Sequence, residues 1–308
     1  MSMIIWLLQI IFIPVLSPLG IGLVKKIKAK MQNRQGASIL QPYRDLWKLF
    51  HKDEIISSDA SWIFRVAPFI IFAVTIIVGA SIPLFGSFLG NYFISDILLI
   101  VYTLAIGTFF IALAGMDTGG AFGGFGSSRE MTVSALAEGG LIFSLLTVAF
   151  HSGSTNLFKI SDRVISSYDF SFLPIILAFL GFFIVLLAEN GRFPFDNPAT
   201  HLELTMIHEA MIIEYSGKRL ALMEWAAANK LLIFGALAVN LFFSAGIAHS
   251  TGLMAIALGI IVLLAKVAVV FIAIAVLEST IAKFRFFRLP DILFISFILN
   301  IAAIALLV

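Results

Sequence analysis

Long apolar runs, separated by polar segments, dominate the chain. A helix needs roughly 20 apolar residues to cross a bilayer, and about eight runs approach that length. They fall at residues 3–24, 66–88, 94–115, 131–150, 170–189, 230–248, 252–279 and 290–308. The pattern predicts an all-α polytopic transmembrane helix bundle, a single integral-membrane domain over residues 1–308.

Composition supports this class. The chain is 60% hydrophobic and 12% charged, with a mean hydropathy of +1.06, whereas soluble domains are about 45–50% apolar and about 25% charged. We therefore exclude an ordinary soluble enzyme and expect membrane lipid, not nucleic acid, around the chain. Cysteine is absent, so no disulfide, thiolate metal site or iron–sulfur cluster is possible on this chain.

Basic residues sort to one side of the predicted membrane. Of the 20 lysines and arginines, seventeen fall in alternate loops and only Lys159 and Arg163 in the others, while Lys266 lies inside a run. The positive-inside rule then places both termini outside. In a prokaryotic inner membrane, the long cytoplasmic loops are 25–65, 116–130, 190–229 and 280–289.

Two of these loops have their own patterns. Aromatic and leucine residues between positions 43 and 50 recur at near-helical spacing, with Asp45 and Lys48 on the wetter side. They predict a short amphipathic helix; the alternative is a plain loop with an aromatic anchor. The loop 116–130 contains five glycines but lacks the lysine of a phosphate loop. We expect a mobile loop at a subunit interface.

The loop 190–229 is interrupted by prolines, after which residues 200–215 have a helical pattern. Thr200 or Asn197 is available as the N-cap. A metal site is disfavoured in this loop, because Ile212 stands where a zincin helix needs its second histidine. The polar side chains on which such a site would depend are His201, Glu203, His208 and Glu209.

Ionisable residues inside predicted spans are costly and indicate function. Glu138 and Lys266 lie well inside their runs, whereas Glu189 and Glu278 lie near the ends of theirs. For Glu189 and Glu278 a simple interfacial position remains an alternative. Buried carboxylates are natural proton-relay groups.

Residues 188–204 read AENGRFPFDNPATHLEL. This segment resembles the Ala-Glu-x-x-Arg-x-Pro-Phe-Asp signature of the quinone-site membrane subunit of NADH:quinone oxidoreductase (complex I), designated 1 or H. Residues 31–36 and 40–54 resemble that family's first cytoplasmic loop, and Arg129 followed by Glu138 resembles its Arg…Glu pair. The resemblance covers essentially the whole chain.

Departures from that pattern favour a different branch. Ala199 and His201 replace acids found in quinone-using members, Ser134 replaces a glutamine, and Glu278 stands in a region where an arginine is expected. With residues 201–217, these features resemble formate hydrogenlyase subunit 4 and hydrogenase-4 component C of energy-converting hydrogenases. The missing acids at positions 199 and 201 count against quinone binding.

The resemblance implies a non-redox membrane anchor that binds no cofactor itself and couples redox chemistry on its partners to proton or sodium movement. The expected partners are [NiFe]-hydrogenase large and small subunits, a ferredoxin-like iron–sulfur subunit and antiporter-like membrane subunits; the nickel–iron site and the clusters lie on those partners. The alternatives are a quinone-site subunit of a complex I-type enzyme and a stand-alone secondary transporter.

The intramembrane positions and this resemblance together select two sets of residues. Those assigned to ion passage are Glu138, Glu189, Glu203, Lys266 and Glu278. Those assigned to docking and coupling are Arg34, Asp45, Lys48, Arg129, Arg192, Asp196, His201, His208, Glu209 and Glu214.

Overall fold

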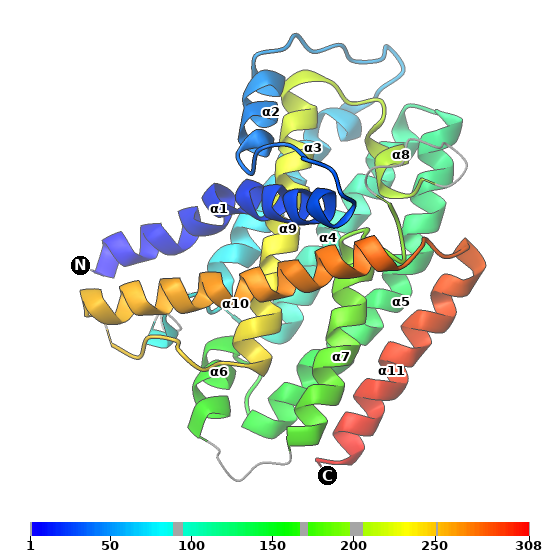
Figure 1. Cartoon of the computed structure of the whole chain (residues 1–308). Helices are drawn as coiled ribbons and strands as arrows, with labels where there is room; N and C mark the ends of the chain where they lie inside the picture. Colours follow the sequence, from blue (N-terminus) through cyan, green and yellow to red (C-terminus); the bar gives the residue numbers. More distant parts are fainter. Residues whose placement is uncertain (1, 89–94, 167–171, 198–205, 251, 308) are drawn as a thin grey trace.

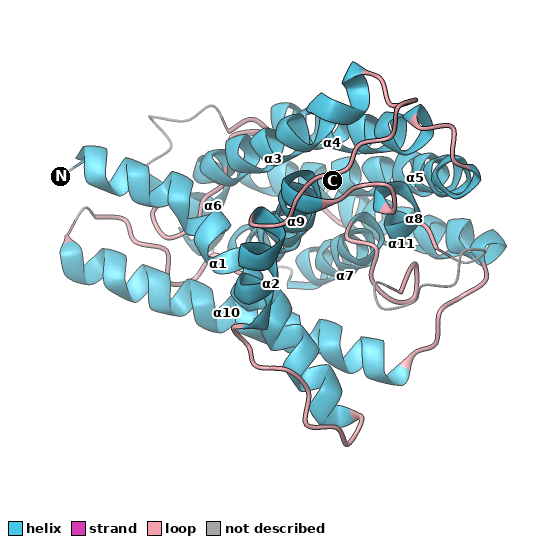
Figure 2. Cartoon of the chain, turned by 90° about the horizontal axis from the view of Figure 1, so that it is seen from above, coloured by secondary structure: helices cyan, strands magenta, loops and turns pink. Residues whose placement is uncertain are grey.

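The computed structural model describes residues 2–88, 95–166, 172–197, 206–250 and 252–307. Within them, every extended regular element is a helix, apart from isolated β-bridges, and Figure 2 accordingly shows helices joined by loops. The predicted all-α architecture is confirmed.

The predicted spans correspond to eight helices among the described residues. Seven are long and apolar enough to cross a bilayer: α1 (Ser2–Met31), α3 (Trp62–Ser81), α4 (Ile97–Asp117), α5 (Ala121–Ser152), α9 (Gly217–Phe242), α10 (Leu253–Thr280) and α11 (Leu289–Ala305), the last preceded by the 3-10 turn η2 (Phe286–Arg288). The eighth, α7 (Phe172–Glu189), is apolar but shorter. The chain is a multi-pass membrane protein; the side on which its termini lie remains a prediction.

The glycine-rich loop predicted at residues 116–130 is wrong, because α5 begins at Ala121. Glycine disfavours a helix interior, but packing outweighs that preference here. A Cβ on Gly123 would lie 2.0 Å from the carbonyl oxygen of Gly115, and one on Gly126 would lie 2.8 Å from Ala210 Cβ. These glycines therefore let α5 approach α4 and α8 closely, as small residues do between membrane helices.

Other boundaries also differ. Because α9 begins at Gly217, the loop predicted at 190–229 ends near residue 216. Of the helix predicted at 200–215, the described residues contain only α8 (His208–Ile212), and Asn197 does not cap it; Thr200 lies outside the described residues. The amphipathic helix of the first loop is confirmed as α2 (Gln41–Phe50), whereas α6 (Leu157–Ser166) was not predicted.

Helix α9 is the central element and the most buried of the spans. It packs against α1, α3, α7 and α10, while α5, α7 and α11 form a group on one side of it (Figure 1). Buried hydrogen bonds fix its register: Ser17 donates to Asn229 Oδ1 at 2.6 Å, and Asn229 Nδ2 donates to Thr75 Oγ1 at 3.0 Å. These bonds tie α1 and α3 to α9 beside Lys230.

Candidate functional site

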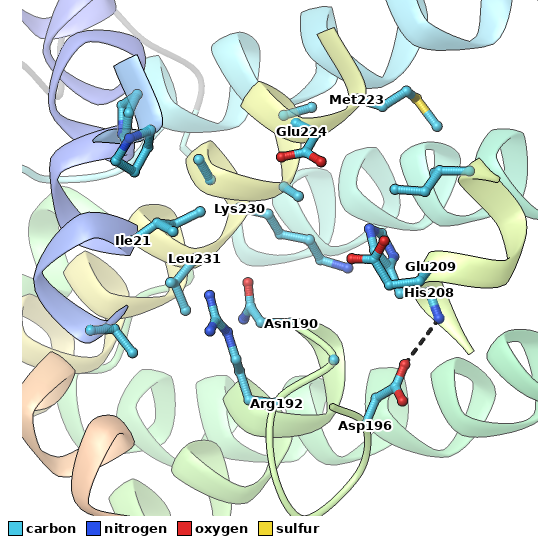
Figure 3. Close-up of a pocket in the computed structure, with 18 of the residues that line it drawn as sticks. Ile21, Asn190, Arg192, Asp196, His208, Glu209, Met223, Glu224, Lys230 and Leu231 are labelled. Carbon is cyan, nitrogen blue, oxygen red and sulfur yellow. Dashed lines mark hydrogen bonds between the residues drawn. The ribbon is translucent and has the colours of Figure 1, made fainter. Parts of the chain in front are cut away.

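A cavity of about 590 Å³ lies between α1, α2, α9 and the loop that follows α7. Figure 3 shows Lys230, Arg192, His208 and Glu209 converging on it from α9, the loop and α8. Its volume falls in the range of ligand sites, yet its wall is densely charged. The acidic and basic residues lining it are Lys25, Lys28, Arg34, Asp45, Glu130, Glu189, Arg192, Asp196, Glu209, Glu224, Lys230 and Glu278.

Glu278, near the end of α10, joins three parts of the chain. Its Oε1 accepts a hydrogen bond from Arg192 at 3.2 Å and its Oε2 one from Lys28 at 3.1 Å. The carboxylate is nearly inaccessible to solvent. A buried charge must be paired, and here two cations, one from α1 and one from the loop after α7, share one acid. Glu278 thus links α1, α10 and the loop after α7 through one buried carboxylate.

Asp196 organises the same loop. Its side chain accepts hydrogen bonds from the backbone N–H groups of Ile207 and His208, at 3.2 and 3.1 Å, and so holds the start of α8. It also pairs with Lys283 Nζ at 2.5 Å, beyond the end of α10. One carboxylate thus links the loop, α8 and the segment between α10 and α11. The geometry suits the ordering role predicted for Asp196, which itself remains a prediction.

Glu189, the last residue of α7, pairs with Lys230 of α9. Its Oε2 lies 2.8 Å from Lys230 Nζ, and its side chain is almost fully buried. Its other oxygen, Oε1, is buried and accepts no hydrogen bond from any described residue. An unsatisfied carboxylate oxygen in a buried site is costly, so this ion pair is incomplete.

Two neighbouring residues of α8 have pKa values that are shifted in opposite directions. Burial lowers the pKa of His208 to about 4, helped by Lys230 and Arg192 and opposed by Asp196. Burial also raises the pKa of Glu209 to about 7, helped by Glu224 and Asp196 and opposed by Lys25. At pH 7, His208 is neutral and Glu209 is poised near half protonation.

The cavity does not bring together all of the predicted residues. Those that line it are Arg34, Asp45, Glu189, Arg192, Asp196, His208, Glu209 and Glu278. Those described but outside its lining are Lys48, Arg129, Glu138, Glu214 and Lys266. His201 and Glu203 lie outside the described residues.

Three of the residues outside the lining have defined contacts. Arg129 donates to the carbonyl oxygen of Met206 at 3.2 Å and so reaches the start of α8. Glu138 accepts a hydrogen bond from Ser134 at 3.4 Å, one turn earlier on α5. Lys266 donates to the Asn240 side chain and to backbone carbonyls at the end of α9. The ion-path role predicted for Glu138 and Lys266 gains no support from the cavity itself.

Sequence reasoning missed Glu130, Glu224 and Lys230 as site residues. Glu130 lay in the supposed glycine loop, and Glu224 and Lys230 lay at the supposed end of a cytoplasmic loop. A helix over residues 217–242 would have revealed part of this wall, because positions 224, 227 and 231 share one face of a helix and all three line the cavity.

The chain is similar to known proteins over nearly its full length. It is 34% identical to hydrogenase-4 component C of Escherichia coli (strain K12) over 97% of this chain and 93% of that protein. It is 29% identical to formate hydrogenlyase subunit 4 of the same organism, over 96% of each. Its fold matches a chain of the membrane-bound sulfane sulfur reductase, an archaeal respiratory membrane complex, with a TM-score of 0.79, 22% identity and coverage of 97% and 98%.

Fold and sequence together define a polytopic helical membrane subunit of the kind found in multi-subunit hydrogenase and complex I-type assemblies. The model of the NADH dehydrogenase family (NADHdh) matches residues 3–308. The chain belongs to that family. The H-type membrane component of the NADH-quinone oxidoreductase of Paraburkholderia xenovorans (strain LB400) is a further relative, 29% identical over 82% of this chain and 74% of that one.

Proposed function

We propose that this chain is the membrane anchor of an energy-converting [NiFe]-hydrogenase or formate hydrogenlyase-type complex, and that it couples the redox arm to movement of protons or sodium ions. The observation that carries the proposal is the charged cavity. It is bounded by the loop after α7, by α8 and by α2, and it reaches ion pairs buried between α1, α7, α9 and α10.

The similarity to two hydrogenase-complex subunits at full length supports the choice of complex. In the proposed assembly, the peripheral hydrogenase subunits and a ferredoxin-like subunit dock on the loops that contain α2 and α8. These partners carry the nickel–iron site and the iron–sulfur clusters, while this chain binds no cofactor. Antiporter-like subunits lie beside it in the prokaryotic inner membrane.

Docking and ion passage meet at the loop after α7. Asp196 holds α8, Arg192 holds Glu278, and both residues are buried in one short segment. A shift of this loop on reduction of the neighbouring cluster would alter the charge environment of Glu278 and of the Glu189–Lys230 pair. A tenfold population change needs only about 1.4 kcal/mol, the equivalent of one pKa unit.

Affinity purification of the tagged chain from its native membrane tests this assignment. We expect a nickel-containing complex that evolves hydrogen with a low-potential donor and does so without added quinone. Isolation of a stable monomer that catalyses substrate uptake would instead identify a secondary transporter, and recovery without nickel would contradict the proposal.

A quinone-site subunit of a complex I-type enzyme is the second candidate. The size of the cavity and the apolar part of its wall, which includes Ile21, Leu104 and Met223, favour it. Measuring hydrogen evolution and quinone reduction side by side on the purified complex separates the two functions. Quinone reduction without hydrogen evolution would select the second candidate.

A further inference from the structure

Lys230 is shared among several acids. It forms its ion pair with Glu189 and also interacts electrostatically with Glu130 and Glu138, both on α5. Three other cations pair with different acids: Arg192 and Lys28 with Glu278, and Lys283 with Asp196. In the described part of the chain, no side chain forms an ion pair or hydrogen bond with Glu130.

Lys230 cannot neutralise all three acids at once. An unpaired carboxylate away from water is strongly disfavoured, and one lysine balances one carboxylate. Lys230 can therefore form an ion pair with only one of these three acids at a time. Glu189 occupies that place in this structure, with one of its oxygens left without a partner among the described residues.

We propose that Lys230 is an ion-pair switch, whose ammonium group exchanges between Glu189 and Glu130 and thereby moves one proton in the opposite direction. In the first state, Lys230 pairs with ionised Glu189 and Glu130 is protonated. In the second state, Lys230 pairs with ionised Glu130, and the proton released by Glu130 resides on Glu189. The total charge and the number of protons are the same in both states.

The geometry suits this exchange. Lys230, Glu189 and Glu130 all line the cavity, and a polar cavity of this size has room for water molecules, through which a proton could pass between the two acids. The Lys230 side chain extends from α9 toward α8, where it lies beside His208 (Figure 3). It is about one-fifth exposed, so the ammonium group borders the cavity.

The exchange also connects to the docking loop. Glu189 ends α7 immediately before the segment that contains Arg192 and Asp196. A displacement of this segment by a redox partner would move Glu189 away from Lys230 and favour the pair with Glu130. The inference thus rests on the proposed coupling function and assigns its charge-moving step to one lysine.

A double variant tests the switch against a static ion pair. In the purified complex reconstituted into vesicles, Lys230→Gln and Glu189→Gln should each weaken assembly, because each leaves a buried charge unpaired. The double variant Lys230→Gln/Glu189→Gln is neutral and should assemble again, while ions moved per hydrogen evolved stay at least about tenfold below the native ratio. Recovery of the native ratio in the double variant would overturn the switch. Lys159→Gln, in α6 outside the cavity, is the matched control and should keep the native ratio.

Infrared difference spectra of the complex on reduction provide a measurement that does not depend on the double variant. The switch predicts paired loss and gain of protonated-carboxyl bands, with one band removed by Glu130→Gln and the other by Glu189→Gln. Spectra without such a pair contradict the switch. If the native complex moves no ion during turnover, both the proposed coupling function and the switch are wrong. If the native complex and the double variant both move ions, only the role of Lys230 is wrong.

Discussion

Lys230 and Lys266 both lie on membrane-spanning helices, and their surroundings differ in kind. Lys230 of α9 meets one carboxylate and has further acids within electrostatic range. Lys266 of α10 donates to Asn240 Oδ1 at 3.0 Å and to the carbonyl oxygens of Phe243 and Ala245, each at 2.9 Å. All three of its hydrogens are thus used by fixed oxygens at the C-terminal end of α9.

The contrast separates a charge held by fixed oxygens from a charge shared among several acids. The C-terminal end of a helix presents unsatisfied carbonyls and a partial negative charge, both of which an ammonium group stabilises. Lys266 therefore holds the segment that follows α9 against α10. Lys230, in contrast, borders a cavity and has more acids than it can neutralise, which is the arrangement expected where protons move.

The largest effect is expected at Glu278, in the region of Lys230. Glu278→Ala would leave Arg192 and Lys28 buried without a counter-charge, a loss of about 3–5 kcal/mol in folding free energy. Thermal unfolding in detergent, together with recovery of the assembled complex, measures it. The matched control is Glu54→Ala at the more exposed pair with Arg219, where about 0–1 kcal/mol is expected. Equal losses at the two sites would contradict the distinction between a buried and a partly exposed carboxylate.

A smaller effect is expected at Lys266. Lys266→Met removes three hydrogen bonds from the end of α9, and the charge-assisted part of that loss predicts a decrease of about 2–3 kcal/mol in stability. Hydrogen exchange should increase first around residues 240–248. If Lys266→Met instead leaves stability unchanged and abolishes ion movement, Lys266 is the transferable charge and the contrast with Lys230 fails.

The smallest effect concerns pH and compares two residues of α8. The pKa of Glu209 is raised to about 7. The folded protein is therefore destabilised by ionisation of Glu209, an effect that is absent below pH 4.5 and grows as pH rises toward 7. The pKa of His208 is lowered to about 4. The folded protein is therefore destabilised by protonation of His208, an effect that is absent above pH 6.5 and grows as pH falls toward 4. Between pH 4.5 and 6.5, the two groups therefore change the folding stability in opposite directions as pH changes.

Single variants separate these slopes. Glu209→Gln should make the complex less stable on acidification, and His208→Gln should make it less stable on alkalinisation, each by about 1–2 kcal/mol after allowance for partial exposure. Unfolding temperatures between pH 4.5 and 7 check both predictions. Parallel pH profiles for the two variants would show that the two groups do not titrate as inferred.

The sequence predicted the features that depend on local pattern. Apolar runs predicted the spans, and helical spacing around Trp47 predicted α2. The motif around Arg192 and Asp196 identified the family and placed several residues that line the cavity. Long-range packing could not be read in the same way. The glycines of α5 look like a loop until Gly115 and Ala210 are seen to touch them.

Charge partners were equally invisible from sequence. Lys28 and Glu278 are 250 residues apart, and Lys230 was assigned to a loop edge because the polar residues that follow Gly217 hide the start of α9. Polar residues that face a buried cavity and polar residues that face water give the same periodicity. Only the packing of α9 against its neighbours distinguishes them.

The most direct test is the number of ions moved per hydrogen evolved by the native complex in sealed vesicles, with Glu138→Gln as the paired variant. We predict that hydrogen evolution by the native complex builds a proton or sodium gradient that an ionophore collapses. In Glu138→Gln, the complex should still assemble, and the gradient should fall by about tenfold. Hydrogen evolution with no gradient in the native complex would contradict the coupling function assigned to this chain.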